Sequence, residues 1–193
     1  MPIVIVATPG DPAANSYITA TEYIAYVATR LAAPSNASTD PESITEPEKK
    51  AMIEATRDVT VLHYCGERAT ATQSLSWPRV WSPNPDAPTT LIDPDLFIPI
   101  GTAQIVYFGA DEIPQRVKDG TCELAMQYLL AGATDLASID PKYNIARESL
   151  DVIETDYIDP ALRAKGLARW PRVMDRIGPL VSRRGSGMQV NRV

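Results

Sequence analysis

The stretch from Thr45 to Gly66, TEPEKKAMIEATRDVTVLHYCG, decides the fold because it carries a complete helix signal. Thr45 and Glu48 form a capping-box pattern, in which each side chain can hydrogen-bond the backbone N–H of the other residue. Pro47 is tolerated, since first-turn N–H groups have no partner inside the helix. Apolar residues then recur at helical spacing, and Gly66 is placed as a C-terminal cap. The pattern predicts a helix with one buried face.

Two further helices are predicted on either side of this one. Toward the N-terminus, Thr19-Ala20-Thr21-Glu22 is a second capping box, and its helix is expected to run to about Ala32 because Pro34 follows. Toward the C-terminus, a third helix opens at Ile113-Pro114 and ends near Gly132. Each helix has a single apolar stripe and is too short to be stable alone in water. The three are therefore expected to pack together as the core.

The remaining segments are predicted from turn, proline and charge patterns. Residues 81–112 form a long proline-rich loop insertion, and so long a loop is usually functional or part of an interface. Asn144–Tyr157 predicts a minor β-hairpin, and a short helix is expected at about 169–177. The predicted fold class is mainly α, a small bundle of three core helices plus the short C-terminal helix, in a domain of residues 1–178. Residues 179–193 have linker chemistry and are expected to form an extended basic C-terminal arm.

The composition is that of a globular protein. With 193 residues, 45% of them hydrophobic and 22% charged, the chain can bury a core of its own. No apolar run approaches the roughly 20 residues that cross a bilayer, so no membrane partner is expected. Two cysteines, Cys65 and Cys122, are too few for a disulfide framework and lack metal-ligand spacing. They are expected to be buried free thiols.

The sequence contains no recognisable catalytic or cofactor-binding motif. It has no phosphate-binding glycine loop, no Gly-x-Ser-x-Gly turn and no His-Glu-x-x-His zinc motif. The one histidine, His63, lies two residues from Cys65 on a predicted helix, where such side chains point to different faces. A packed or capping role is expected for it. We therefore expect no enzyme activity, no catalytic residue, no cofactor and no metal site. An enzyme whose carboxylates converge from distant parts of the chain is the third hypothesis, after the two given below.

Charge is distributed unevenly along the chain. The formal net charge is −6, but residues 160–193 carry eight basic residues and one acid, a charge of +7. The remainder carries ten basic and 23 acidic residues, a charge of −13. An acidic body with a basic end predicts binding to an acidic partner surface or to nucleic acid. The alternative is a solvated basic helix face with no specific partner.

Three signatures occur in an order and spacing that resemble one family of tailed-bacteriophage proteins. They are Ala14-Asn15-Ser16-Tyr17 before the first helix, Gln73-Ser74-Leu75-Ser76-Trp77-Pro78-Arg79 after the second, and Ile113-Pro114-Gln115-Arg116-Val117 at the start of the third. The resemblance covers roughly residues 11–180, and the second signature is its most specific part. Its members are often labelled DnaT-like single-stranded-DNA-binding proteins. The motif residues expected to have a structural role are Asn15, Ser16, Tyr17, Gln73, Leu75, Trp77, Pro78 and Arg79.

The same sequences also look like head–tail connector or adaptor proteins, which complete the phage head. The resemblance implies a structural virion protein that forms a ring of subunits, expected to be a dodecamer, between the portal and the tail. The implied partners are the portal protein, neighbouring copies of the chain, and a tail-side connector or tail protein. Genomic DNA would pass through the lumen without specific binding. The implied location is the head–tail junction of the virion, after a stage in the host cytoplasm.

Two groups of contact residues follow from this resemblance. The residues expected to bind the portal, on the C-terminal arm, are Arg183, Arg184, Met188, Val190 and Arg192. Those expected to contact a neighbouring subunit or the tail, on the long loop, are Trp81, Leu96, Phe97, Ile98, Tyr107 and Phe108. This loop is longer here than the linker usual in the family.

The alternative function is single-stranded-DNA binding of the DnaT-like type. Trp77 and Arg79 form one pair, and Trp170 and Arg172 form another, each placing a cation near an indole. Base stacking combined with phosphate contact is how single strands are bound. The acidic body weighs against this alternative, because such binding depends on neutralising phosphates.

Overall fold

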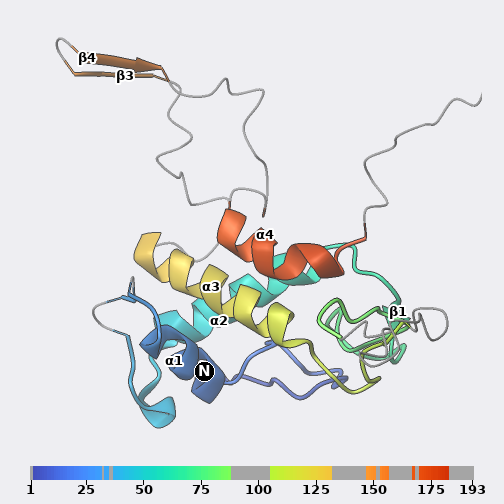
Figure 1. Cartoon of the computed structure of the whole chain (residues 1–193). Coiled ribbons are helices and arrows are strands. Elements are labelled where there is room, and N and C mark those ends of the chain that lie inside the picture. The colour runs from blue at the N-terminus through green and yellow to red at the C-terminus, as the bar shows by residue number, and fades with distance from the viewer. Residues whose placement is uncertain are drawn as a thin grey trace, which may run out of the picture.

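The computed structural model is mainly helical, which confirms the predicted fold class (Figure 1). It describes residues 2–31, 33–34, 37–87, 105–131, 147–150, 153–156, 167 and 170–182, with only the backbone for 147–150 and 153–156. Its α-helices are α1 (Ala20–Ala28), α2 (Glu46–Thr60), α3 (Gln115–Ala131) and α4 (Pro171–Ile177). The 3₁₀ helices with bounds in the described ranges are η1 (Pro41–Ser43) and η5 (Gly178–Leu180). The strands are β1 (Glu67–Arg68), β2 (Arg79–Val80), β3 (Arg147–Leu150) and β4 (Ile153–Asp156).

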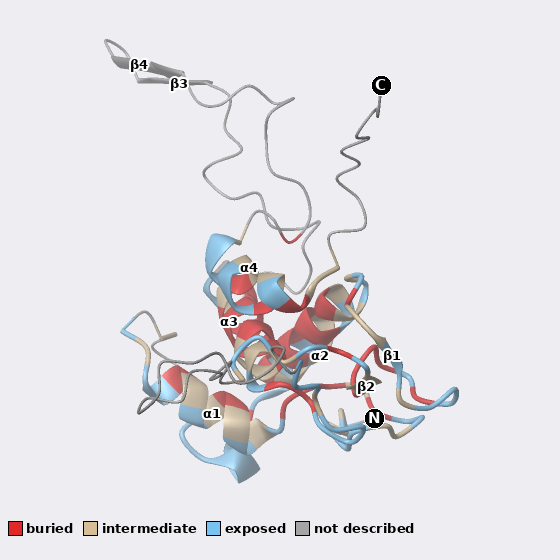
Figure 2. Cartoon of the chain, turned by 45° about the vertical axis from the view of Figure 1, so that its right-hand side comes forward, coloured by how far each residue is buried: buried red, intermediate tan, exposed pale blue. Residues whose placement is uncertain are grey.

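Helix α3 is the centre of the bundle and contacts α1, α2 and α4. Its predicted apolar stripe is buried at Val117, Leu124, Ala125 and Tyr128, and Figure 2 shows the buried residues gathered where the helices meet. Helix α4 approaches α3 closely at Gly120, where a Cβ atom would lie 2.5 Å from the Ile177 side chain. The absence of a side chain at this position therefore sets how closely α4 packs on the core.

Both predicted capping boxes are present. At α2, the Thr45 hydroxyl accepts from the backbone N–H of Glu48 at 3.4 Å, and the Glu48 carboxylate accepts from the backbone N–H of Thr45 at 2.8 Å. The Glu48 side chain is buried and also accepts from the N–H and the hydroxyl of Ser38. Thr19 and Glu22 form the matching box at α1. Local side-chain chemistry thus starts both helices.

The predicted ends of the first two helices were too late. Helix α1 ends at Ala28 instead of about Ala32, and α2 ends at Thr60 instead of near Gly66. The reason at α2 is tertiary, because the Thr60 carbonyl accepts a hydrogen bond from the Ser76 hydroxyl at 2.6 Å. His63 consequently lies beyond the helix and is exposed, so its expected packed or capping role is not observed.

Gly66 serves a purpose other than capping. Its φ is +76°, in the left-handed region, and a Cβ atom there would lie 2.3 Å from the Val80 carbonyl oxygen. Only glycine therefore lets β1 and β2 pair beside it as a short antiparallel ladder.

Strands β3 and β4 form the predicted hairpin, with Leu150 opposite Ile153 and Arg147 opposite Asp156. Both strands lie inside the predicted Asn144–Tyr157 segment. No helix in the described ranges is long and apolar enough to cross a membrane.

We predict that Glu48→Gln lowers the free energy of unfolding by about 1–2 kcal/mol at pH 7, because a neutral amide replaces a buried carboxylate with four hydrogen bonds. Burial alone would raise the pKa of Glu48, but the hydrogen bonds from Ser38 and Thr45 outweigh burial and hold the pKa below its ordinary value. A lowered folded-state pKa stabilises the protein above the unfolded value, and this stabilisation is lost as pH falls through the folded pKa. The difference between variant and wild type should therefore shrink in acid.

The measurement is urea unfolding of both proteins between pH 3 and pH 7. Glu42→Gln is the matched control, since Glu42 is exposed on η1. A difference that is absent, or that stays constant across this pH range, would contradict the role given to Glu48.

Candidate interaction surfaces

The Gln73–Arg79 block folds into a buried turn beside the end of α2. Trp77 is 1% exposed and packs edge-to-face against Tyr64 and Phe108, with ring centroids 5.5 and 5.7 Å away. Gln73 is also buried, and its amide nitrogen donates to the carbonyls of Leu75 and Pro78 at 2.9 and 3.0 Å. The Trp77–Pro78 peptide bond is cis. Trp77 therefore has no free face on which a base could stack.

Arg79 uses its guanidinium group on the protein's own backbone. It donates to the carbonyls of Cys65 at 2.8 Å, of Ser76 at 3.2 Å and of Gly66. Burial lowers the pKa of Arg79 from its ordinary value, and the neighbouring Arg68 adds to this effect. Arg79 is thus an internal cross-link, and neither Arg79 nor Trp77 is placed to bind nucleic acid.

The Ala14–Tyr17 signature lies against the same turn. The Tyr17 hydroxyl accepts from the Thr60 hydroxyl at 2.9 Å and from the Ser76 N–H at 3.1 Å. Asn15 binds the N-terminal segment through its side chain, which accepts from the Val6 N–H and donates to the Val4 carbonyl, both at 2.8 Å. The first two signatures are therefore one hydrogen-bonded junction in space.

The third signature opens α3, where Ile113 and Val117 are buried. In the same helix Cys122 is a buried free thiol, as predicted, and burial raises its pKa. Cys65 is a free thiol that is only half-buried. The described residues contain no cluster of three or more histidine, cysteine, aspartate or glutamate side chains that could hold a metal ion.

An exposed apolar patch, here called the aromatic surface, consists of Trp81, Ile105, Val106 and Tyr107. Trp81 is 69% exposed and meets Tyr107 edge-to-face, with ring centroids 5.7 Å apart. The backbone φ of Trp81 is +59°, a left-handed conformation that costs a non-glycine residue about 1–3 kcal/mol.

Two backbone hydrogen bonds hold this patch together. The Asn84 N–H donates to the Val106 carbonyl at 2.8 Å, and the Phe108 N–H donates to the Ser82 carbonyl at 3.1 Å. Two segments on either side of residues 88–104 are thereby fixed side by side. The aromatic surface is therefore a rigid base from which that loop leaves the body.

The long-loop residues predicted to form an interface fall into three groups. Trp81 and Tyr107 belong to the aromatic surface. Phe108 is half-buried and turns inward against Trp77. Those outside the described residues are Leu96, Phe97 and Ile98, and the same holds for the arm residues Arg183, Arg184, Met188, Val190 and Arg192.

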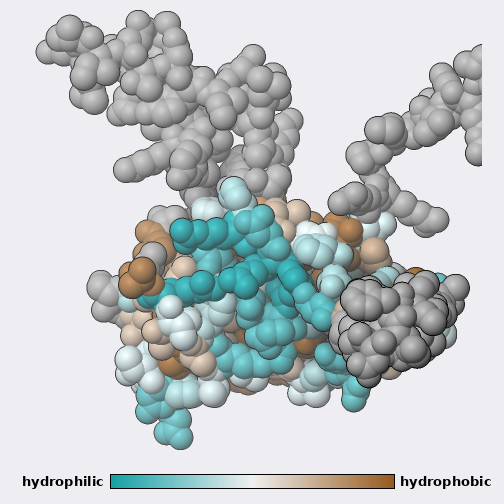
Figure 3. All heavy atoms as spheres, in the orientation of Figure 1, coloured by the Kyte–Doolittle hydropathy of each residue, from teal (hydrophilic) through white to brown (hydrophobic). Residues whose placement is uncertain are grey.

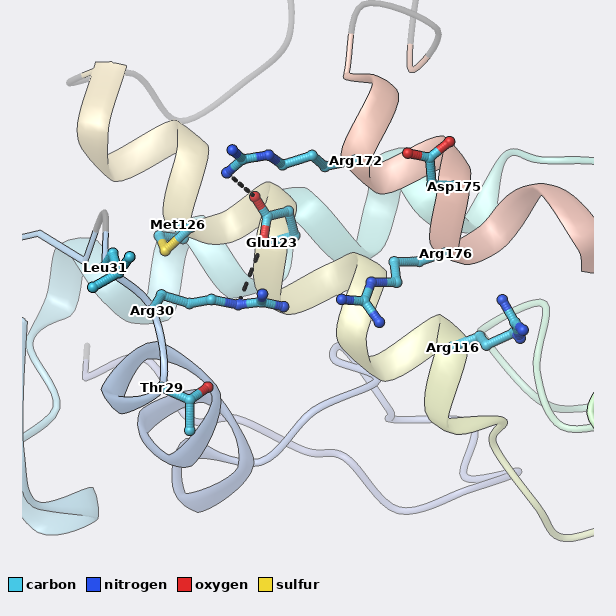
Figure 4. Close-up of a pocket in the computed structure, with 9 residues that line it drawn as sticks. All are labelled: Thr29, Arg30, Leu31, Arg116, Glu123, Met126, Arg172, Asp175 and Arg176. Carbon is cyan, nitrogen blue, oxygen red and sulfur yellow. Dashed lines mark ion pairs between the residues drawn. The ribbon is translucent and has the colours of Figure 1, made fainter.

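A cleft of about 650 Å³, here called the arginine cleft, opens between the end of α1, α3 and α4 (Figure 4). Its cationic lining consists of Arg30, Arg116, Arg172 and Arg176. Glu123 lies within it, its side chain 3% exposed, and ion-pairs with Arg30 and Arg172 at 3.9 Å. Figure 3 shows the hydrophilic band that these elements present on the surface, with apolar side chains beside the C-terminal end of α3.

The ion pairs that Glu123 and Arg176 make in the cleft are long. Arg176 lies 3.8 Å from Asp119, and this distance, like the two at Glu123, exceeds that of a hydrogen bond. Glu123 accepts shorter bonds from the Tyr26 hydroxyl at 2.9 Å and from Gln127 at 3.1 Å. Burial, followed by the bond to Glu123, raises the pKa of Tyr26 and keeps its hydroxyl protonated. The carboxylate of Glu123 is thus hydrogen-bonded by Tyr26 and Gln127 and not by the arginines. Arg30 donates instead to the Tyr26 hydroxyl, and Arg116 donates to the Asp86 carboxylate.

The second predicted tryptophan–arginine pair is Trp170 and Arg172. Arg172 lies on the rim of the arginine cleft, and its side chain is 76% exposed. Trp170 is half-buried at the start of α4. Sequence reasoning did not find the cleft. The available signals were the one-turn spacing of Arg172 and Arg176, and a glutamate at position 123 on an otherwise apolar helix face.

The comparisons with known proteins give one match. The model of the family described as "Putative DnaT-like ssDNA binding protein" matches residues 1–95 and 101–193. The chain belongs to this family. Residues 96–100, which the DnaT-like family model does not cover, fall within the 81–112 loop that was predicted to be longer here than in the family. No curated protein and no solved structure matches the chain.

We predict that Arg79→Met lowers the free energy of unfolding by about 3 kcal/mol, because three half-buried backbone carbonyls lose a charged donor at once. Arg79→Lys should recover less than half of this loss, since an ammonium group cannot present the planar fork of a guanidinium. Urea unfolding measures both, with Arg68→Met on the exposed neighbouring strand as the control. An Arg79→Met variant as stable as wild type would show that Arg79 is not the cross-link described.

Proposed function

We propose that this chain is a head–tail adaptor, a structural protein that forms a ring of subunits between a phage portal and the tail. The observation that carries the proposal is the exposed aromatic surface at the base of the long loop. The comparisons name single-stranded-DNA binding and no virion protein. Support for the adaptor comes instead from the resemblance of the three signatures and from surfaces suited to protein contacts.

The aromatic surface has the composition of a protein-binding site. Aromatic side chains are enriched at the centres of interfaces, where tryptophan and tyrosine contribute most to affinity. Trp81 and Tyr107 are exposed yet braced by each other and by the backbone bonds at Ser82 and Asn84. A preorganised aromatic pair loses little conformational freedom on binding. In the proposed ring it would contact a neighbouring subunit or a tail protein.

The C-terminal arm would supply the contact to the portal. Residues 179–182 are packed on the body, since Leu180 is buried and the Ser182 N–H donates to the His63 carbonyl at 2.7 Å. Portal binding is therefore assigned to residues 183–193, where Arg183, Arg184 and Arg192 can pair with portal carboxylates.

We predict that the double variant Trp81→Ala/Tyr107→Ala builds rings of subunits on portals at least about 30-fold more weakly, because each subunit loses two central aromatic contacts to its neighbours. The side chains are exposed, so the melting temperature should stay close to that of wild type. Co-sedimentation with purified portal rings measures binding. The control is Val4→Ala/Val61→Ala, which truncates two exposed apolar side chains elsewhere. A full ring of the aromatic variant on portals at the concentration that suffices for wild type would contradict the proposal.

Single-stranded-DNA binding is the second candidate, and the family's description favours it. The structure limits how the chain could bind single-stranded DNA, since Trp77 is buried and Arg79 donates hydrogen bonds to the protein's own backbone. Trp81 and Tyr107 are the exposed aromatics of the described chain that a base could stack on.

If the adaptor proposal is correct, an oligothymidylate should cause no saturable quenching of tryptophan fluorescence at low salt. Quenching that saturates, weakens steeply with added salt and disappears in Trp81→Phe would establish the second candidate instead. Trp170→Phe is the control variant, because its indole is half-buried at a different place in the fold.

A further inference from the structure

The N-terminal segment, residues 2–8, has one backbone edge that is bound and one that is not. The Asn15 side chain accepts from the Val6 N–H and donates to the Val4 carbonyl, both at 2.8 Å. The Val6 carbonyl accepts from the backbone N–H groups of Asn15 and Ser16 at 2.9 and 3.2 Å. In an extended chain, alternate residues present their backbone groups to the same edge. The bound edge is therefore that of Val4 and Val6.

The opposite edge belongs to Ile3 and Ile5. Among the described residues, none donates to or accepts from the backbone of either isoleucine. Native proteins protect such an edge with charged side chains, or with a proline that removes a donor. Residues 2–8 include no charged side chain, and the missing N–H of Pro2 falls on the edge that Asn15 binds. The free edge is thus left as a template for another strand.

The side chains of this stretch are those of a strand in a sheet. Ile5 packs against the core, and Ile3, two positions away, is half-buried. Val4 lies between them and is 65% exposed. β-Branched residues are enriched in strands and stabilise a sheet through contacts between directly opposite side chains. The stretch therefore has the composition and the alternation of a strand that lacks a neighbour on one side.

The order of these residues indicates which neighbour fits. Ile3-Val4-Ile5 is the same in both directions, so two copies in antiparallel alignment place Ile3 opposite Ile5 and Val4 opposite Val4. The two free edges then meet, and each Ile3–Ile5 pair exchanges both of its backbone hydrogen bonds. No charge on either segment opposes this contact. A self-complementary surface is what a two-fold contact between identical chains requires.

We propose that two copies of this chain pair through their Ile3–Ile5 segments, as antiparallel strands about a two-fold axis. Such a contact joins two copies and then closes. It is thus separate from the ring contact and the portal contact proposed above, and goes beyond that function.

Disulfide trapping in the full chain tests the register of the pairing. Val4 and its copy form a non-hydrogen-bonded pair with Cα atoms about 4.5 Å apart, within the range that a disulfide spans. Val4→Cys, in a chain with Cys65→Ser, should therefore form a covalent dimer at least about tenfold faster than the controls under mild oxidation. The control Thr8→Cys lies on the same segment, roughly 20 Å or more from its copy. The control Val61→Cys is exposed on another part of the body.

A proline tests whether the backbone edge makes the contact. Ile3→Pro removes an N–H from the free edge and leaves the bonds to Asn15 in place, so it should slow the cross-linking of Val4→Cys at least about fivefold. Ile3→Ala retains the N–H and should stay within about twofold of the parent. Melting temperatures show that each variant is folded. Equal slowing by both variants would overturn the pairing, because the contact would then depend on the side chain and not on the backbone edge.

Amide hydrogen exchange in the wild-type chain distinguishes a second copy from a segment of the same chain. The pairing predicts that protection of the Ile3 and Ile5 amides rises with protein concentration. Equal protection at every concentration would show that the chain covers its own edge, and no protection would show that the edge stays open to water. Either result overturns the proposal, as do Val4→Cys dimers that form no faster than the controls. None of these measurements uses portals, so their outcome is independent of the adaptor proposal.

Discussion

The hydroxyl group of Tyr17 is the point on which the rest of the structure depends. It accepts hydrogen bonds from Thr60, at the end of α2, and from the backbone of Ser76, in the turn that follows. Burial, which outweighs these bonds, raises the pKa of Tyr17, so the group stays a neutral hydroxyl. Through this one atom the N-terminal segment, the second helix and the tryptophan-containing turn are fixed in one arrangement. Removing it would leave the Ser76 N–H without a partner in a buried place.

The position of every surface discussed above follows from this junction. Ser76 ends α2 by bonding the Thr60 carbonyl, Arg79 then closes the turn on the Cys65 carbonyl, and the chain emerges at Trp81 facing solvent. The Gln73–Arg79 signature, the most specific one of the family, thus stabilises the fold. The exposed residues that it orients are the ones free to bind partners.

The sequence predicted those parts of the fold that are set locally. Capping boxes at Thr19 and Thr45 start their helices whatever surrounds them, and the stripe of α3 is buried where its periodicity placed it. The ends of α1 and α2 were predicted less well. The end of α2 depends on a hydrogen bond from Ser76, sixteen residues away in sequence. Local capping patterns therefore cannot predict where α2 ends.

The same limit applies to the candidate sites. Trp77 and Arg79 have the residue types of a strand-binding surface, but residue type does not show that an indole is enclosed by Tyr64 and Phe108. The arginine cleft was not predicted because its residues come from α3, α4 and the segment just after α1, which only the packing brings together. Trp81 is exposed at the base of the long loop, and its expected role in an interface stays a prediction.

An adaptor needs surfaces that bind other proteins, whereas a DNA-binding protein needs a surface that neutralises phosphates. The described body offers an apolar aromatic patch and a cleft whose arginines are partly balanced by carboxylates. The whole chain carries a net charge of −6, which disfavours wrapping by a polyanion and suits a conduit that DNA must pass without sticking.

The most direct measurement is cryo-electron microscopy of the purified chain mixed with portal rings from the same source. The account predicts an added ring of subunits on the portal, with residues 183–193 ordered against it and the aromatic surface at a contact between neighbours. Portals that stay bare, under conditions where the chain is folded, would contradict the adaptor and leave single-stranded-DNA binding as the function to pursue.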